Sequence, residues 1–475
     1  MERSCFPRFL LAGLRGGSGK TLVSLGLGRV LTEKGYKIKA FKKGPDYIDA
    51  KWLSLAVGSE ASNLDPFLFP KNKVKDLFFS FRDDFDLALV EGNRGLFDGK
   101  DIYGSFSTAE LAKLLGIPVI LVVDCTKITR TMAAIVLGIN SFEPNLNLAG
   151  VILNRTAGPR HRKILRDSIE YYTDVPVLGI LPKLKTNPIP ERHMGLISDQ
   201  EYNQEVGKIF QTLSKVCKDN LDIERIINIA QEVPLFHKIK VPLFNRINKD
   251  EVCIGIVKDS AFWFYYEENF KALEAAGAKL KFLSLLDDSP WPEIDALYIG
   301  GGFPETLALQ LENNRFKRQL LNNLANSGLP IYAECGGLMF LSRSITFHEN
   351  TYQMANVFPI DIGVQKKPKG HGYVEGEINL KNPFFPKGYK LLGHEFHYSY
   401  CLNERIELDF ALNLARGVGV CSGKDGIIYK NVFASYTHIH ALGNPKWARN
   451  FVLAAKQYQL YKQSNTLPAP KIIAS

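Results

Sequence analysis

The sequence lacks long hydrophobic runs. Its longest apolar stretches, such as IPVILVV at 117–123, are far shorter than the roughly 20 residues that span a bilayer. The amino-terminal FPRFLLAGL is too short for a convincing secretory signal and leads directly into a glycine-rich loop, which favours a first β-strand. We therefore expect no membrane segment and no membrane partner.

Paired cysteines are also missing. The 7 cysteines form no CxxC pair and no framework spacing, which is typical of a protein of the reducing cytoplasm. Lysine and arginine exceed aspartate and glutamate by 10, an excess that suits nucleic acid, a membrane surface or a small polyanionic ligand. Because no RRM, helix-turn-helix or zinc-finger pattern gathers these charges, we expect no nucleic acid partner.

The chain does contain two runs in which β-prone and helical segments alternate. The first includes RFLLAGL, KIKAFKKG, LALVEGN, IPVILVVD and LAGVILNR, with helical patterns such as TLVSLGLGRVLTEKG between them. The second follows with EVCIGIVKD, ENFKALEAAGAK, LKFLSLL, DALYIGGG and LPIYAEC. This βαβ rhythm predicts mostly parallel sheets with flanking helices. We therefore predict an α/β protein with one domain at 1–236, a linker at 237–250 and a second domain at 251–475.

The segment GLRGGSGKT at 13–21 follows a predicted strand and opens a predicted helix, which is the context of a phosphate-binding loop. Its glycines permit close backbone approach, N–H groups at the helix start face an anion, and Lys20 adds positive charge. Leu14 stands where the standard spacing has glycine, so the loop is a deviant form, and a plain helix start is the alternative. The predicted nucleotide contacts are Gly13, Arg15, Gly16, Gly17, Ser18, Gly19, Lys20 and Thr21.

Two further segments carry acids near the carboxyl ends of predicted strands, KKGPDYID and VEGNRGLFDG. Such ends converge on the phosphate site of a parallel sheet. We predict that Asp46 and Glu91, together with Thr21, hold a magnesium ion. Asp49 and Asp98 are predicted substrate contacts, and solvated loop carboxylates are the alternative for all four acids.

Asn154 and Arg155 follow the predicted strand LAGVIL. Their position predicts an edge of the adenine pocket, with a plain helix cap as the alternative.

The segment IYAECGGLMFLS places Cys335 between β-prone residues and Gly336-Gly337, which has the form of a nucleophile elbow with cysteine in place of serine. A lone cysteine is more often structural than catalytic. Two features favour catalysis here. The strand DALYIGGGFPE ends in glycines, and the N–H groups of Gly301 and Gly302 are predicted to form an oxyanion hole. His438, in VFASYTHIHALG, is the predicted general base that raises the thiolate fraction.

These motifs resemble two known families. AECGGLMFL, GGGFPE and ASYTHIH are similar to a class I glutamine amidotransferase domain, whereas GLRGGSGKT, KKGPDYID and VEGNRGLFDG are similar to the synthetase domain related to dethiobiotin synthetase. Their fusion in this order resembles the cobyrinic acid a,c-diamide synthase family of the cobalamin pathway. The segments AFWFYYEENFKALEAAGA, IPERHMGL and GHEFHYS support that resemblance, which covers nearly the whole chain.

The resemblance implies a glutamine-hydrolysing ligase that uses ATP and magnesium. Cys335 would take the glutamine amide as a thioester with His438 as its base, and the ammonia would react with an acyl phosphate on a tetrapyrrole polyacid. Amidation of nickel-sirohydrochlorin in coenzyme F430 assembly uses the same motifs and is the close alternative. A partition-type ATPase switch with an inactive glutaminase-like half is the alternative from another class.

Two positions depart from the pattern. In many class I glutaminases a glutamate stands two residues after the histidine, where this sequence has His440, so the group that orients His438 is left open. Arg15 replaces the small polar residue that close relatives carry, and it would contact phosphate in its own subunit or across a homodimer. Glu395 and His394 lie in the motif GHEFHYS without an assigned step, and a packed loop is the alternative there.

Overall fold

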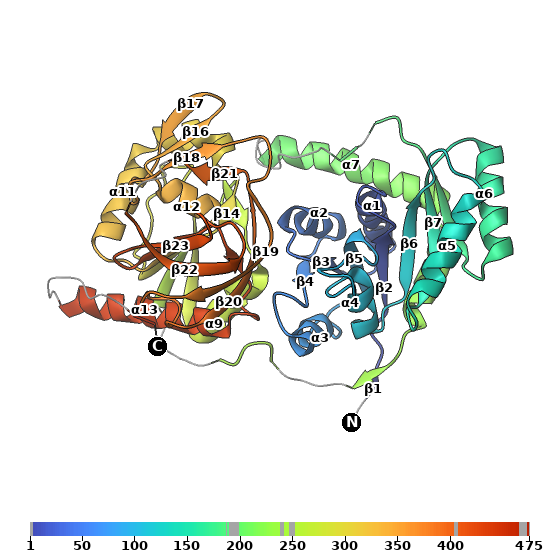
Figure 1. The fold of residues 1–475 in the computed structure, drawn as a ribbon, viewed down its shortest axis with the longest axis horizontal. Coiled ribbons are helices and arrows are strands. Elements are labelled where there is room, and N and C mark those ends of the chain that lie inside the picture. Colours follow the sequence, from blue (N-terminus) through green and yellow to red (C-terminus); the bar gives the residue numbers. More distant parts are fainter. Residues whose placement is uncertain are drawn as a thin grey trace. The chain divides into compact units, whose positions relative to one another are not determined.

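The computed structural model describes residues 3–186, 188–189, 199–237, 242–246, 252–402, 407–464 and 473–474. The chain divides into two compact units (Figure 1). Unit 1 comprises 1–66, 71–192 and 198–243, and unit 2 comprises 67–70, 193–197 and 244–475. The predicted domain bounds stay a prediction, and much of the predicted linker lies outside the described residues.

Unit 1 is built on a wholly parallel sheet of seven described strands in the order β4-β3-β5-β2-β6-β7-β8. These strands are β2 (Arg8–Gly13), β3 (Ile38–Lys43), β4 (Ser62–Leu64), β5 (Leu87–Gly95), β6 (Val119–Asp124), β7 (Leu148–Thr156) and β8 (Val177–Pro182). Every residue of β2 and β3 is buried, as expected for strands covered on both faces. A short pair, β1 (Arg3–Ser4) and β9 (Phe236–His237), lies apart from this sheet.

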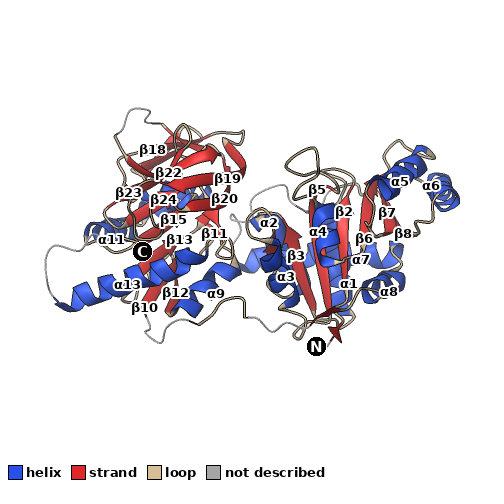
Figure 2. Ribbon diagram, turned by 60° about the horizontal axis from the view of Figure 1, so that its bottom comes forward, coloured by secondary structure: helices blue, strands red, loops and turns tan. Residues whose placement is uncertain are grey.

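Helices lie on both faces of this sheet, as Figure 2 shows. They are α1 (Lys20–Glu33), α2 (Tyr47–Val57), α3 (Lys71–Phe79), α4 (Thr108–Leu115), α5 (Thr131–Phe142), α6 (Pro159–Tyr172), α7 (Asp199–Asn220) and α8 (Ile223–Gln231). Local signals explain where the helices begin and end. Asp46 caps the start of α2 by accepting from Asp49 N, and Gly58 ends it with a positive φ of 69°.

Unit 2 is built on a sheet of ten described strands in the order β12-β10-β13-β15-β24-β23-β22-β19-β20-β25. They are β10 (Val252–Val257), β12 (Ala278–Leu283), β13 (Ala296–Ile299), β15 (Ile331–Glu334), β19 (Gly370–Ile378), β20 (Lys390–His397), β22 (Asp409–Arg416), β23 (Lys424–Tyr429), β24 (Val432–Ser435) and β25 (His438–Ile439). The strands from β12 to β24 pair in parallel. From β24 onward every pair is antiparallel. The α/β class is as predicted, but the rhythm of the sequence did not indicate this antiparallel half.

The other elements of unit 2 surround this sheet. Two small sheets join β11 (Phe262–Phe264) to β14 (Gly301–Gly302), and β16 (Ser344–Phe347), β17 (Asn350–Gln353), β18 (Asp361–Val364) and β21 (Ser399–Cys401) to one another. The helices are α9 (Glu267–Ala276), the 3-10 turn η1 (Pro304–Leu307), α10 (Ala308–Asn313), α11 (Arg315–Asn326), α12 (Gly336–Leu341) and α13 (Pro445–Ser464). Among the described helices, none is both long and apolar enough to cross a membrane.

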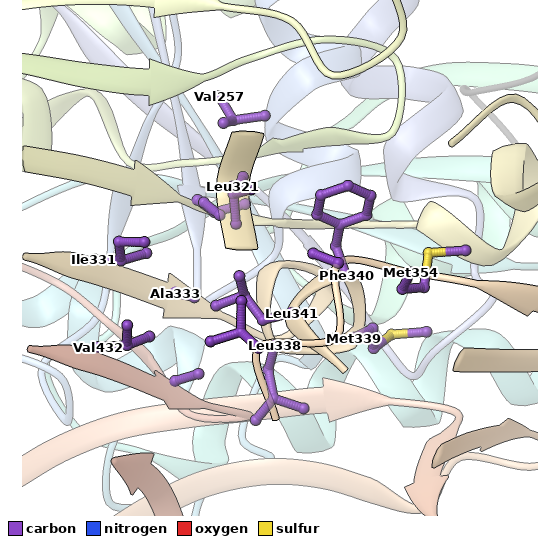
Figure 3. Packing of buried hydrophobic residues seen from close by; sticks show 14 of the residues in the cluster. Val257, Leu321, Ile331, Ala333, Leu338, Met339, Phe340, Leu341, Met354 and Val432 are labelled. Atoms are coloured by element: carbon purple, nitrogen blue, oxygen red, sulfur yellow. The ribbon is translucent and has the colours of Figure 1, made fainter. Parts of the chain in front are cut away.

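The short helix α12 is held by a hydrophobic core. Figure 3 shows Leu338, Phe340 and Leu341 of this helix beside Ile331 and Val432 of the neighbouring strands. All six residues of α12 are buried. Because the helix begins directly after Cys335, this packing fixes the position of the cysteine backbone.

Candidate functional site

In unit 1, the strand order brings the predicted ATP-site residues to one edge of the sheet. The neighbouring strands β3, β5, β2, β6 and β7 run in parallel, so their carboxyl ends lie side by side. KKGPDYID begins with the last two residues of β3, and the phosphate loop follows β2. Asn154 and Arg155 lie inside β7, which continues to Thr156, and not after the strand as predicted. Glu91 lies inside β5, because this strand continues to Gly95, so the predicted loop position of Glu91 was wrong.

The phosphate loop has the backbone conformation that its sequence predicts. Gly17 and Gly19 have φ values of 76° and 90°, which favour glycine, and α1 begins directly after Gly19. The Ser18 hydroxyl folds the loop by donating to Arg15 O at 2.9 Å. Lys20 is buried, and burial together with the nearby Lys42 lowers its pKa. The loop thus offers N–H groups and a lysine to an anion.

A buried cluster of opposite charges adjoins the loop. The Lys42 Nζ donates to Glu91 Oε1 at 2.7 Å and to Asp49 Oδ2 at 2.5 Å, and Thr21 Oγ1 donates to the same Glu91 oxygen at 2.8 Å. Burial opposes the charge of Lys42, but the carboxylates of Asp49 and Glu91 raise its pKa. Burial and the Asp49 charge raise the pKa of Asp46 to about 6. Lys42 was not predicted from the sequence, although three lysines, Lys39, Lys42 and Lys43, in an otherwise apolar strand could have indicated it.

One oxygen of this cluster fits a metal ion. Glu91 is fully buried, and its Oε2 has no hydrogen-bond partner among the residues that the structure describes. Within the same described part, no three His, Cys, Asp or Glu side chains form a metal-binding group. Mg²⁺ is commonly held by one or two carboxylates plus phosphate oxygens and water, so Glu91 and Thr21 suit it with ATP present. Asp98 lies nearby in the chain and accepts from Gly95 N at 2.8 Å.

Asn154 and Arg155, on β7, make different contacts. Asn154 is buried and donates to Ser18 O at 2.9 Å, so it braces the phosphate loop. Arg155 pairs with Asp124 at 2.8 Å, and Arg15, whose side chain is 74% exposed, lies 3.8 Å from the same carboxylate. Asp124 was not predicted. Its carboxylate is shared by both arginines.

In unit 2, Cys335 occupies a strained turn between β15 and α12. Its φ and ψ are 47° and −99°, a conformation that non-glycine residues rarely adopt. Cys335 N donates to Ser435 O at 2.7 Å, and Met339 N donates back to Cys335 O at 3.0 Å. Burial, and then the Glu305 charge, raise the pKa of the Cys335 thiol. The resting cysteine is therefore a thiol that needs a base to react.

The glycine strand β14 lies against His438 and against Gly336, the residue that follows Cys335. A Cβ on Gly301 would collide with His438 Cε1 and lie 3.3 Å from His438 Nε2. A Cβ on Gly336, next to the cysteine, would lie 3.0 Å from Gly302 N. The structure thus gathers Cys335, His438 and the two glycines around one point of unit 2.

His438 is almost completely buried on β25. Its Nδ1 lies 3.4 Å from Glu334 Oε2, and the His394 ring stacks against it with centroids 4.9 Å apart. Burial, followed by the neighbouring His438, lowers the pKa of His394 well below its ordinary value, so His394 is neutral. His394 therefore supports the ring of His438 without adding charge.

The acid of GHEFHYS has a structural role. Glu395 accepts from Val418 N at 2.7 Å and from Gly419 N at 3.0 Å. Burial opposes its charge, but His397 and these N–H groups lower its pKa. Glu395 therefore fastens the turn after β22. The motif IPERHMGL falls almost wholly outside the described residues.

The sequence matches two family models. The CobQ/CobB/MinD/ParA nucleotide binding domain matches residues 9–197, and the CobB/CobQ-like glutamine amidotransferase domain matches residues 253–446. A curated cobyrinate a,c-diamide synthase of Magnetococcus marinus is 40% identical over 93% of this chain and 96% of its own. Relatives of the same name from Methanobrevibacter smithii and Dehalococcoides mccartyi are 37% and 40% identical, each over 95% of this chain and 99% of their own. The chain therefore belongs to the cobyrinate a,c-diamide synthase family.

Proposed function

We propose that this protein amidates the a and c side-chain carboxylates of cobyrinic acid, with ATP as the energy source and glutamine as the nitrogen donor. The observation that carries the proposal is that one chain holds a phosphate loop with a buried Lys-carboxylate cluster and a cysteine elbow beside a buried histidine. The relatives that share nearly its whole length bear the corresponding name.

In unit 1, the phosphate loop and Lys20 hold the ATP phosphates. The substrate carboxylate attacks the γ-phosphorus in line, the bond to the β-phosphate oxygen breaks, and ADP leaves an acyl phosphate behind. Asp49 and Asp98 position the substrate. Thr21, Glu91 and Asp46 would hold magnesium, which would neutralise charge on the phosphates. Because no side chain forms a covalent bond in phosphoryl transfer, catalysis depends on positioning of the reactants and on stabilisation of charge.

In unit 2, Cys335 Sγ attacks the glutamine amide carbon while His438 Nε2 takes the thiol proton. The N–H groups of Gly301 and Gly302 stabilise the tetrahedral oxyanion. His438 returns the proton to the leaving nitrogen, which departs as ammonia, and water then hydrolyses the thioester to glutamate. Ammonia attacks the acyl phosphate, forming the amide and releasing phosphate.

A polyacidic tetrapyrrole suits a chain with a formal net charge of +10. The same chemistry on nickel-sirohydrochlorin would use the same residues, so the two substrates are separated by experiment. A nucleotide switch with an inactive second half is disfavoured because the cysteine elbow keeps its strained conformation and its buried histidine.

The test is mass spectrometry of products after incubation with ATP, magnesium and glutamine, with cobyrinic acid and nickel-sirohydrochlorin in separate tubes. We expect two acid-to-amide conversions on cobyrinic acid. Cys335→Ser should abolish amidation with glutamine but retain it with ammonium chloride, because only the nitrogen supply is lost. ATP hydrolysis without amidation of either substrate would contradict the proposal.

A further inference from the structure

The residue that would orient the catalytic histidine in many glutaminases is absent from its usual place. His440 stands two residues after His438, and it is fully buried. Its Nε2 lies 3.6 Å from Glu268 Oε2, and its Nδ1 accepts from Leu442 N at 3.2 Å. His440 is therefore engaged with its own carboxylate, and any acid serving His438 must come from another part of the chain.

Glu334 places a carboxylate next to Nδ1 of His438. It is the last residue of β15, directly before Cys335, and it is fully buried. Its Oε2 lies 3.4 Å from His438 Nδ1 and accepts from the Tyr298 hydroxyl at 3.1 Å. Its Oε1 accepts from Ile439 N at 3.2 Å. One carboxylate thus contacts both the ring of His438 and the peptide that follows it.

The elbow explains how adjacent residues serve one site. Successive side chains of a regular strand point to opposite faces, so a residue directly before the nucleophile would face away from it. The positive φ of Cys335 interrupts this alternation at the end of β15. Glu334 remains in the strand and faces His438, while Cys335 turns into the site from the other side of the bend.

A carboxylate at Nδ1 has a defined effect on a histidine base. It favours the tautomer that carries its proton on Nδ1, which leaves the Nε2 lone pair free to accept the thiol proton. It also stabilises the imidazolium formed when that proton arrives. Two other described neighbours of the ring carry no negative charge, since His394 is neutral and Phe264 is apolar, with ring centroids 4.9 and 6.4 Å away.

We propose that Glu334 is the positioning residue of the glutaminase, holding His438 in the Nδ1–H tautomer with Nε2 directed toward the cysteine and Gly301. The proposal rests on the glutaminase role assigned above to Cys335 and His438. Under this proposal, the nucleophile Cys335 and the residue that orients its base, Glu334, are neighbours in the sequence.

The test compares Glu334→Gln with wild type in the full-length protein. The glutamine side chain is nearly the same size, and its one carbonyl oxygen can still accept from Ile439 N, but it carries no charge and presents an NH₂ group where Oε2 of Glu334 faces Tyr298 and His438. We expect kcat for glutamine hydrolysis to fall about 10²- to 10⁴-fold with KM for glutamine changed less than about threefold, as when a triad acid becomes an amide. The pH–rate profile should also change, because the charge next to the base is lost.

Glu268→Gln is the matched control. It makes the same change in an equally buried carboxylate that faces a histidine, but that histidine is His440. We expect this control to keep glutamine hydrolysis within about threefold of wild type, since it leaves the catalytic pair intact. Glu334→Asp, which keeps the charge, should recover part of the activity lost in Glu334→Gln.

Amidation supported by ammonium chloride separates the outcomes. If Glu334→Gln keeps it, the fold is intact and the loss belongs to the glutaminase. If Glu334→Gln also loses amidation supported by ammonium chloride, the comparison is made with Glu334→Asp and Tyr298→Phe instead. An unchanged kcat and an unchanged pH–rate profile for glutamine hydrolysis in both of these variants would overturn the proposal. Full glutamine hydrolysis by Glu334→Gln would likewise overturn it while leaving the proposed function standing. A Cys335→Ser variant that still hydrolyses glutamine would instead refute the proposed function.

Discussion

Lys42 is a buried lysine held between two carboxylates. Its side chain is 1% exposed, and it is shared by Asp49 and Glu91. Replacing it with methionine leaves these acids without their positive partner, so Lys42→Met should lower the free energy of unfolding by about 3–5 kcal/mol. Amidation should fall at least ~100-fold with glutamine and with ammonia alike, because the Thr21–Glu91 contact loses its support. Chemical denaturation and product mass spectrometry measure the two effects.

Lys39→Met is the control for this variant. Lys39 is also buried on β3, but its Nζ donates to the carbonyl of Glu60 and lies over the Phe81 ring. Loss of this lysine should cost stability without reducing amidation beyond the loss of folded protein. Equal losses of activity in both variants would show that Lys42 acts through the fold alone.

Glu305 is a half-buried carboxyl group whose Oε2 is buried, and it affects the nucleophile. Burial raises its pKa to about 7, and its charge in turn raises the pKa of the Cys335 thiol. Because Glu305 is protonated below this pH and ionised above it, it disfavours the thiolate only on the alkaline side. Glu305→Gln should therefore speed alkylation of Cys335 by about three- to tenfold above pH 8 and leave the rate unchanged below pH 6.

The measurement for Glu305 is peptide mass spectrometry after timed iodoacetamide treatment, since Cys5 and Cys421 are also exposed to the reagent. The acid range serves as the internal control. The prediction fails if the two proteins react at the same rate across the whole pH range.

At the scale of elements, β14 lies beside His438 and beside the residue after Cys335, and it requires glycine. A Cβ on Gly301 would meet the ring of His438, which is fixed on β25. Gly301→Ala should therefore displace the histidine and reduce glutamine-dependent amidation at least ~10-fold, with ammonia-dependent amidation unchanged. Both activities are read from the same product assay.

Gly363→Ala on β18 is the matched control for Gly301→Ala. A Cβ there would meet only the ends of the Leu402 and Tyr400 side chains, the nearest at 3.0 Å. We expect both activities to persist in this variant. If the two alanines reduce glutamine use equally, the collision with His438 is not the cause.

The elements that the sequence predicted are those with strong local signals. The β-prone runs of unit 1 and the helix after GLRGGSGKT appear where expected, because buried parallel strands read as continuous apolar runs. The antiparallel half of unit 2 was not predicted. Its strands, such as β19 and β22, mix buried and exposed residues irregularly, so no clear period marks them.

The site residues that lie in sequence motifs were predicted, whereas those that lie in ordinary strands were not. Cys335, His438 and the phosphate loop carry motifs with a local mechanism, so their spacing was sufficient to indicate them. Lys42 and Glu334 were not indicated, because each lies within an ordinary strand and gains its role from partners far along the chain. Glu334 meets His438 only after the chain has returned 104 residues later, and that pairing depends on the fold.

At the scale of the whole molecule, the proposed synthetase residues belong to unit 1 and the proposed glutaminase residues to unit 2. The two half-reactions should therefore be separable by mutation. Lys20→Ala should lose amidation with either nitrogen source and keep glutamine hydrolysis, because Lys20 lies in the phosphate loop. Cys335→Ser should show the reverse pattern.

Mixing these two variants tests whether ammonia stays with the chain that releases it. In the mixture, one protein makes ammonia and another holds the acyl phosphate, so nitrogen must cross free solution. Near neutral pH most of it is protonated there and cannot attack. Glutamate dehydrogenase with its cosubstrates, added as an ammonia scavenger, should thus abolish amidation in the mixture while leaving wild type with more than about half of its rate, because an intramolecular step keeps a high effective concentration. Equal sensitivity to the scavenger would show that the protein releases ammonia to solvent before using it.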